Sequence, residues 1–133
     1  MLQVDDNEFT LLVEEGIDKI PEKFKVLLDN VVISWADVPT PEQLSKAKLR
    51  RSQGLFGLYE GVPQTARGAG YSSLPDRITI FRQAILHSCR TADEARDQVA
   101  ETVWHELAHH FGSSEERVRK AQQRRRSRIN KFA

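Results

Sequence analysis

Apolar residues near the start of the chain recur every three or four positions, which is the spacing of an amphipathic helix. The recurring residues are Phe9, Leu12, Val13, Gly16, Ile17 and Ile20. We expect Asp6 or Asn7 to cap this helix, because a short polar side chain can accept a hydrogen bond from a backbone N–H of the first turn. Pro21 interrupts the pattern and predicts a second, short helix through residues 24–28.

Three short runs of β-branched and aromatic residues predict strands. They are VVISWAD at 31–37, LFGLYEG at 55–61 and RITIF at 77–81. Residues 61–76 are rich in Gly, Pro and Ser, which predicts a long loop between the second and third strands. A weak helical pattern covers 40–51 and a short helix is expected over 82–90. A long helix then follows from about Thr91 to Phe111.

The long helix has one apolar and one polar side when its residues are placed 100° apart. The apolar side comprises Val99, Ala100, Val103, Trp104, Leu107, Ala108 and Phe111. His105 and His109 share the far side, because residues four positions apart lie only about 40° from each other. Glu106 lies between the two sectors. His110 points into the apolar side, where we expect a buried and hydrogen-bonded histidine rather than a metal ligand.

The chemistry of a metal site requires this spacing. Two imidazoles one helical turn apart can bind one zinc ion from the same side, at about 2.0–2.1 Å each. A carboxylate beside the first histidine can take the proton of the metal-activated water and pass it to the leaving amine. We therefore favour a zinc site on His105 and His109, with Glu106 as general base, over a chance occurrence of HExxH.

A catalytic zinc usually has three protein ligands, so one more is needed. The only acids after His109 are Glu115 and Glu116. Gly112 is suited to end the helix and turn the chain back, so that Glu115 can face the metal. Glu116 fits a capping box of a following helix, although a shift of one residue would exchange the two glutamates. His87 is a weaker alternative, because it lies upstream on a separate element.

The motif HExxHxxGxxE at 105–115 resembles the long zincin motif, HExxHxxGxx followed by His or Asp. The whole chain resembles a family of small bacterial zincin-like proteins described as zinc metallopeptidases. The segments that carry the resemblance are LLDNVVISWAD, LFGLYEGVPQT, LPDRITIFR and VWHELAHHFGSSEERV, in that order. The resemblance implies an α+β fold, the minimal zincin, with the active-site helix beneath a small mixed sheet. It also implies one zinc per chain on His105, His109 and an acid at position 115, where relatives usually carry Asp, and Glu106 as base.

Zincins align extended peptides against an edge strand of the sheet. By that resemblance, the leading candidate for the edge is the strand formed by Arg77, Ile78, Thr79, Ile80 and Phe81. The alternative is an interior strand with Ile78 and Ile80 in the core. Tyr71 in the Gly-rich loop is our first candidate to stabilise the oxyanion, ahead of Tyr59 and Arg67.

The amino-acid composition restricts the class of protein and its expected location. The 133 residues are 39% hydrophobic and 29% charged, which suits one soluble domain. The single cysteine, Cys89, excludes an internal disulfide and fits a reducing compartment. The first residues lack the features of a signal peptide and no apolar run approaches the roughly 20 residues of a membrane span. We therefore expect a cytoplasmic protein with no membrane association.

Charge is distributed unevenly along the chain. Residues 117–133 hold eight Lys and Arg and no acid, and the other 116 residues carry a net charge of −7. Clustered Arg in the tail (123–133) suggests a nucleic-acid or acidic partner. We favour a solvated, disordered tail, since the segment lacks interleaved aromatics.

Taken together, the residues and the resemblance predict one zincin-like domain over 1–133. Its expected activity is zinc-dependent hydrolysis of a peptide or protein substrate. The alternative is a regulatory or binding protein of the same fold whose site is weak or inactive.

Overall fold

The three predicted strands form one mixed sheet in the computed structural model, which describes residues 2–47, 55–61 and 74–111. The strands are β1 (Val31–Ala36), β2 (Gly57–Glu60) and β3 (Asp76–Phe81). Their order in space is β1-β3-β2, with β1 parallel and β2 antiparallel to β3. The α+β class and the small mixed sheet are thereby confirmed.

The central position of β3 makes one prediction wrong. Arg77, Ile78, Thr79, Ile80 and Phe81 do not form an edge strand, because β3 pairs with β1 on one side and β2 on the other. Ile80, for example, lies between Trp35 of β1 and Gly57 of β2. Burial gives the physical reason: Ile78, Ile80 and Phe81 are 0% exposed and Thr79 only 6%, so both faces of the strand are covered. The interior alternative is therefore correct, and β1 and β2 are the edges among the described strands.

The helices occupy the positions that their patterns predict. In chain order they are α1 (Asp6–Asp18), α2 (Glu22–Lys25) with the 3₁₀ turn η1 (Val26–Leu28), α3 (Pro41–Ala47), α5 (Arg82–Ser88) and α6 (Ala92–Phe111). The cap of α1 is Asp5 rather than Asp6 or Asn7, since its carboxylate accepts the Glu8 N–H at 2.8 Å. Thr91 caps α6 in the same way, accepting the Glu94 N–H at 3.1 Å. Within the described parts of the chain, no helix has the length and apolar character to cross a bilayer.

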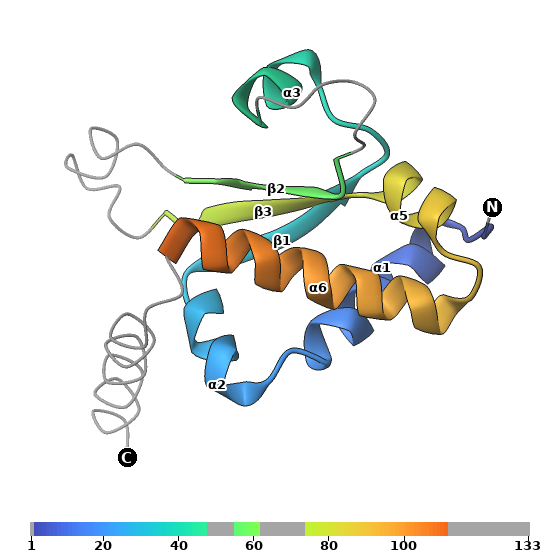
Figure 1. The fold of residues 1–133 in the computed structure, drawn as a ribbon, viewed down its shortest axis with the longest axis horizontal. Coiled ribbons are helices and arrows are strands. Elements are labelled where there is room, and N and C mark those ends of the chain that lie inside the picture. Colours follow the sequence, from blue (N-terminus) through green and yellow to red (C-terminus); the bar gives the residue numbers. More distant parts are fainter. Residues whose placement is uncertain (1, 48–54, 62–73, 112–133) are drawn as a thin grey trace.

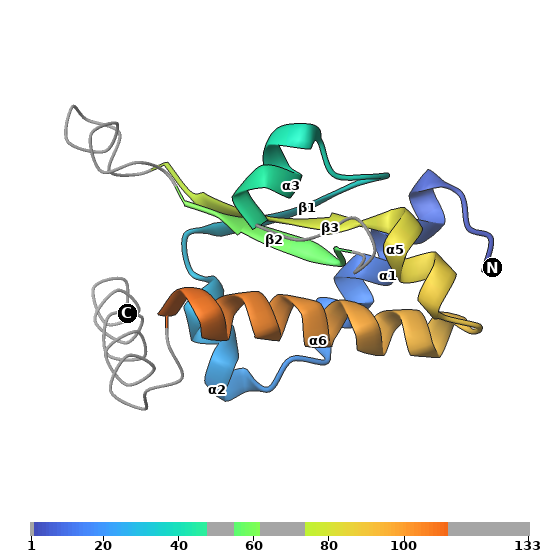
Figure 2. The same cartoon turned by 45° about the horizontal axis from the view of Figure 1, so that its top comes forward.

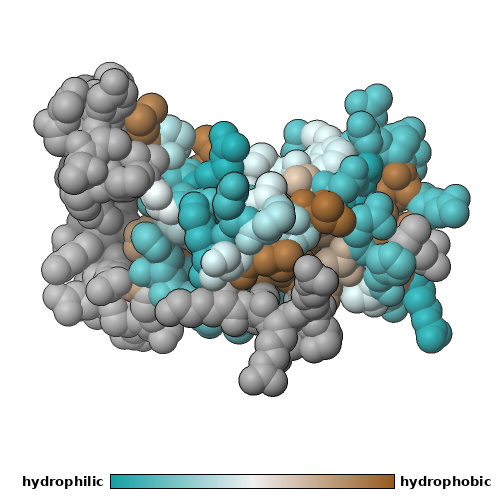
Figure 3. Space-filling model, turned by 90° about the horizontal axis from the view of Figure 1, so that it is seen from above, coloured by the Kyte–Doolittle hydropathy of each residue, from teal (hydrophilic) through white to brown (hydrophobic). Residues whose placement is uncertain are grey.

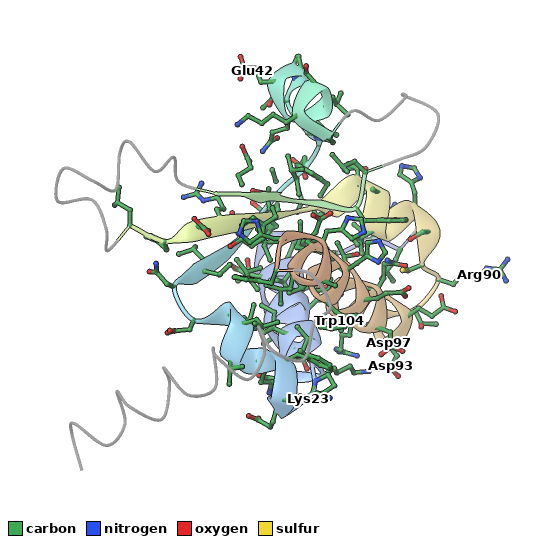
Figure 4. The ribbon with its side chains drawn as sticks, turned by 60° about the vertical axis from the view of Figure 1, so that its left-hand side comes forward. Lys23, Glu42, Arg90, Asp93, Asp97 and Trp104 are labelled. Carbon is green, nitrogen blue, oxygen red and sulfur yellow. The ribbon has the colours of Figure 1, made fainter. Side chains whose placement is uncertain are left out.

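The helices cover the two faces of the sheet unequally. α1 and α6 lie together against one face, and α3 lies on the other side (Figure 1, Figure 2). The core lies between the sheet and α6, where Val99, Val103 and Leu107 are 0% exposed. α2 packs against α6 through Phe24 and Trp104, whose ring centroids are 4.0 Å apart (Figure 4). Seen from the side of α3, the surface is mainly hydrophilic, with hydrophobic residues in separate patches (Figure 3).

Two glycines allow α6 to lie unusually close to its neighbours. A Cβ on Gly16 of α1 would lie 2.8 Å from the Arg96 carbonyl oxygen and 2.9 Å from Val99 Cβ. A Cβ on Gly57 of β2 would lie 2.7 Å from the Thr102 methyl group. Because real Cβ atoms are not found at such distances, any larger residue would push α6 away from α1 or from β2. The position of α6 beneath β2 therefore depends on Gly57.

An arginine connects the elements at one end of the sheet. Arg82, the first residue of α5, donates through Nε to Asp37 at 2.6 Å and through Nη1 to Asp6 at 2.7 Å. The hydrogen bond to Asp6 is the main reason that the pKa of Arg82 is raised. Its guanidinium lies 4.5 Å from the centre of the Trp35 ring, and Trp35 donates to Thr10 of α1 at 3.0 Å. These contacts hold α1, β1 and α5 together.

Candidate metal and catalytic site

His105 and His109 project from the same side of α6. Their ring centroids are 4.5 Å apart, and both side chains are exposed. The opposite side of the helix is held in the core by Val99, Val103 and Leu107, which fixes the direction in which the histidines point. The structure thus brings the two predicted ligands together on one accessible face.

Glu106 occupies a different environment from its neighbours. Its side chain is partly buried, and burial raises the pKa of its carboxyl above the ordinary value. A hydrogen bond from the backbone of Tyr59 on β2 and the nearby imidazoles of His109 and His105 act in the opposite direction. Glu106 is therefore a carboxylate with increased proton affinity whose position is fixed by the edge strand.

A cavity of about 600 Å³ lies between α6 and the segment around β2. The α6 wall comprises His105, Glu106 and His109 together with Gln98, Glu101 and Thr102. Residues 55–58, with Ala47 at the end of α3, form the opposite wall. The sequence pattern predicts a strand over 55–61, but it does not indicate that this strand forms a wall of a cavity. The glycine in that strand was the signal that a helix approaches it closely.

Tyr59 and His110 form a second cluster beside the motif. Their rings are stacked, with centroids 3.9 Å apart and planes 14° apart. The Tyr59 hydroxyl donates to Asp76 at 2.6 Å, so it is not directed at the cavity as an oxyanion donor would be. His110 is 41% exposed, and the expectation that it is buried is wrong. Its position in the last turn of α6 places it against the ring of an edge-strand residue rather than inside the core.

Several predicted site residues lie outside the described residues. These are Glu115, Glu116, Gly112, Tyr71 and Arg67, as well as the basic tail (123–133). His87 is exposed on α5 and does not join the histidine pair. Across 2–47, 55–61 and 74–111, no group of three or more His, Cys, Asp or Glu side chains is arranged to hold a metal. Within this part of the chain, the candidate donors are therefore the two imidazoles of α6.

The histidine pair fits a zinc ion in chemistry and spacing. Neutral imidazole is a common zinc ligand, and rings whose centroids are 4.5 Å apart can both reach one ion at about 2.0–2.1 Å. Both rings face a cavity with room for a substrate.

Comparison with known families agrees with this arrangement. The sequence model of one family, described as zincin-like metallopeptidase, matches residues 28–125. The match includes the three strands and the whole of α6. No individual curated protein matches the chain. Because the family match extends over most of the 133 residues, the chain belongs to the zincin-like metallopeptidase family.

Proposed function

We propose that this protein is a zinc-dependent peptidase that hydrolyses peptide bonds. The observation that carries the proposal is that His105, Glu106 and His109 line one cavity, with the carboxylate partly buried between helix and strand. Membership in a metallopeptidase family supports the same chemistry.

In this proposal, His105 and His109 hold the zinc ion through their imidazole nitrogens. Glu115 is the proposed third protein ligand, and it lies outside the described residues. Bound zinc supplies Lewis acidity, which makes a water molecule nucleophilic at neutral pH.

Glu106 is the proton carrier in the proposed reaction. Its carboxylate accepts a proton from the attacking water while the water oxygen bonds to the carbonyl carbon of the peptide. When the C–N bond breaks, the same proton passes from Glu106 to the leaving nitrogen. The raised pKa of Glu106 suits a group that holds a proton between these steps. The hydrogen bond from the Tyr59 backbone keeps the carboxylate in place.

The substrate is proposed to bind as an extended peptide along β2. This strand is an edge of the described sheet, and its residues Gly57 and Leu58 line the cavity. Extended peptides commonly bind by adding a strand to such an edge through main-chain hydrogen bonds. Tyr71 remains a prediction for the oxyanion donor.

The test combines zinc content with hydrolysis of a peptide library by the purified protein. We expect one zinc per chain in the wild type, and loss of zinc in His105→Ala and His109→Ala. Glu106→Gln should retain zinc but hydrolyse peptides about 10²–10⁴-fold more slowly, which is the usual contribution of a general base. Glu42→Gln is a matched control, since Glu42 is exposed on α3 and points away from the rest of the molecule (Figure 4).

Full activity in Glu106→Gln would reject the proposed role of this carboxylate. A wild-type protein that holds zinc on the histidine pair but cleaves no peptide would instead support a binding protein of this fold.

A further inference from the structure

The cavity extends well beyond the residues proposed for catalysis. Its α6 wall runs from His109 back to Gln98. Gln98 lies seven residues before His105, which is about 10 Å along a helix axis. This N-terminal arm of the cavity, lined on α6 by Gln98, Glu101 and Thr102, can therefore hold a substrate side chain next to the scissile bond.

The walls of this arm combine apolar surface with one available negative charge. Leu55, Phe56, Gly57 and Leu58 form the strand side of the cavity, and all four residues are apolar. Gln98 and Thr102 are engaged with each other, because the Gln98 amide donates to the Thr102 hydroxyl at 3.1 Å. Glu101 is exposed, and no hydrogen bond or ion pair joins its carboxylate to another described residue.

Among the described residues, the charged side chains that line the cavity are acidic. Glu101 and Glu106 are the carboxylates among its lining residues, and no Lys or Arg of the described chain lines it. Glu101 lies one helical turn before His105, about 6 Å along the axis. A side chain that is complementary to this stretch, from the histidine pair to Glu101, has an apolar stem of several carbons and a cationic end.

We infer that this arm of the cavity binds the side chain of a Lys or Arg residue that flanks the scissile bond. The methylene stem packs on the apolar wall, while the charged end meets the Glu101 carboxylate. The inference rests on the peptidase activity proposed above and specifies its substrate class: peptides with a basic residue beside the cleaved bond.

The test uses sets of peptides that differ at one position only, occupied by Arg, Lys, Gln or Glu. Each position within three residues of the cleaved bond is varied in turn, and kcat/KM is measured with the zinc-loaded protein. Binding of the same peptides, labelled with fluorescein, is measured by anisotropy on Glu106→Gln. This second readout does not depend on turnover.

At one position adjacent to the cleaved bond, we expect Arg and Lys to exceed Gln by about two- to fivefold in both readouts, as for a solvent-exposed ion pair. Glu101→Gln should remove this preference, and Glu101→Lys should reverse it in favour of Glu. Glu42→Gln, the matched exposed carboxylate on α3, should leave the preference unchanged.

Two results would overturn the inference while leaving the peptidase proposal intact: cleavage without preference for a basic residue, or a preference that persists in Glu101→Gln. If the wild type cleaves no peptide, the proposed function itself fails, and that result is separate from any effect of Glu101.

Discussion

Replacing Gly57 by alanine tests whether close packing of β2 on α6 defines the site. The added Cβ would lie 2.7 Å from the Thr102 methyl group, 3.2 Å from the Thr79 carbonyl oxygen and 3.3 Å from Ile80 Cδ1. Neither neighbouring side chain can move easily, because Thr102 is only 6% exposed and Ile80 is 0% exposed. The strand or the helix must therefore shift.

The expected loss of stability follows from two opposing effects. Overpacking of this kind destabilises by about 1–3 kcal/mol. Reduced freedom of the unfolded chain returns about 0.4–1 kcal/mol when glycine becomes alanine. The net decrease in the free energy of unfolding should be about 1–2 kcal/mol, or about 3–8 °C in Tm for a protein of this size.

The measurement is urea and thermal unfolding followed by circular dichroism. Gly61→Ala is the matched control, because its Cβ would meet atoms only at 3.6 Å and beyond, and we expect it to be neutral or slightly stabilising. Thr102→Ser removes the methyl group at 2.7 Å and keeps the hydroxyl that Gln98 contacts. The double variant should therefore recover about 1 kcal/mol relative to the sum of the single changes. The reasoning fails if Gly57→Ala is as stable as the wild type, or if Thr102→Ser gives no recovery.

Three further predictions concern contacts around the sheet. Tyr59→Phe removes the hydrogen bond to Asp76 and should lower the free energy of unfolding by about 1–2 kcal/mol at neutral pH; an unchanged urea midpoint would contradict it. The pKa of Glu60 is lowered in the folded protein, mainly by its hydrogen bond with Gln43 and next by that with Lys46. Glu60 therefore stabilises the fold at pH values above its ordinary pKa of 4.5, and this stabilisation is lost as the pH falls through the pKa of the folded state. Glu60→Gln should therefore be less stable than the wild type by about 0.5–1 kcal/mol at pH 7, with the difference disappearing in acid; a difference that is independent of pH would refute this. Arg82→Lys keeps the charge, but a lysine cannot reach Asp6 and Asp37 together, so the free energy of unfolding should fall by about 1–2 kcal/mol. Arg90→Lys is the control and should have no measurable effect, because the Arg90 side chain is exposed and points away from the molecule (Figure 4).

The long helix was the most predictable element of the fold. Its apolar period placed Val99, Val103 and Leu107 in the core, and all three are 0% exposed. The same period placed His105 and His109 on one accessible side. The same period does not place Thr102 in the core, because the burial of this polar residue depends on a glycine in a strand far away in the sequence.

Strand pairing could not be predicted from the strands one at a time. The five residues from Arg77 to Phe81 carry a strand signal, but whether such a strand is an edge or an interior one depends on what flanks it. Three consecutive apolar or β-branched residues before Phe81 were compatible with burial on both faces, and the structure shows that burial. The exposure of His110 could not be predicted for a similar reason. The angular position of a residue on a helix shows which side it lies on, but not whether the sheet extends far enough to cover it.

The topology also determines the order in which these parts can assemble. β1 and β3 pair between residues that are 45 positions apart, such as Val31 and Asp76. The β2–β3 pairing is more local, since Glu60 and Arg77 are 17 positions apart, so it can form before the β1–β3 ladder, whose partners lie 45 positions apart. Pairings over such separations slow folding because chain entropy is lost before contacts are gained. A polypeptide emerging from synthesis would thus acquire its helices and the β2–β3 pair early, while the β1 edge of the sheet would be among the last features to mature.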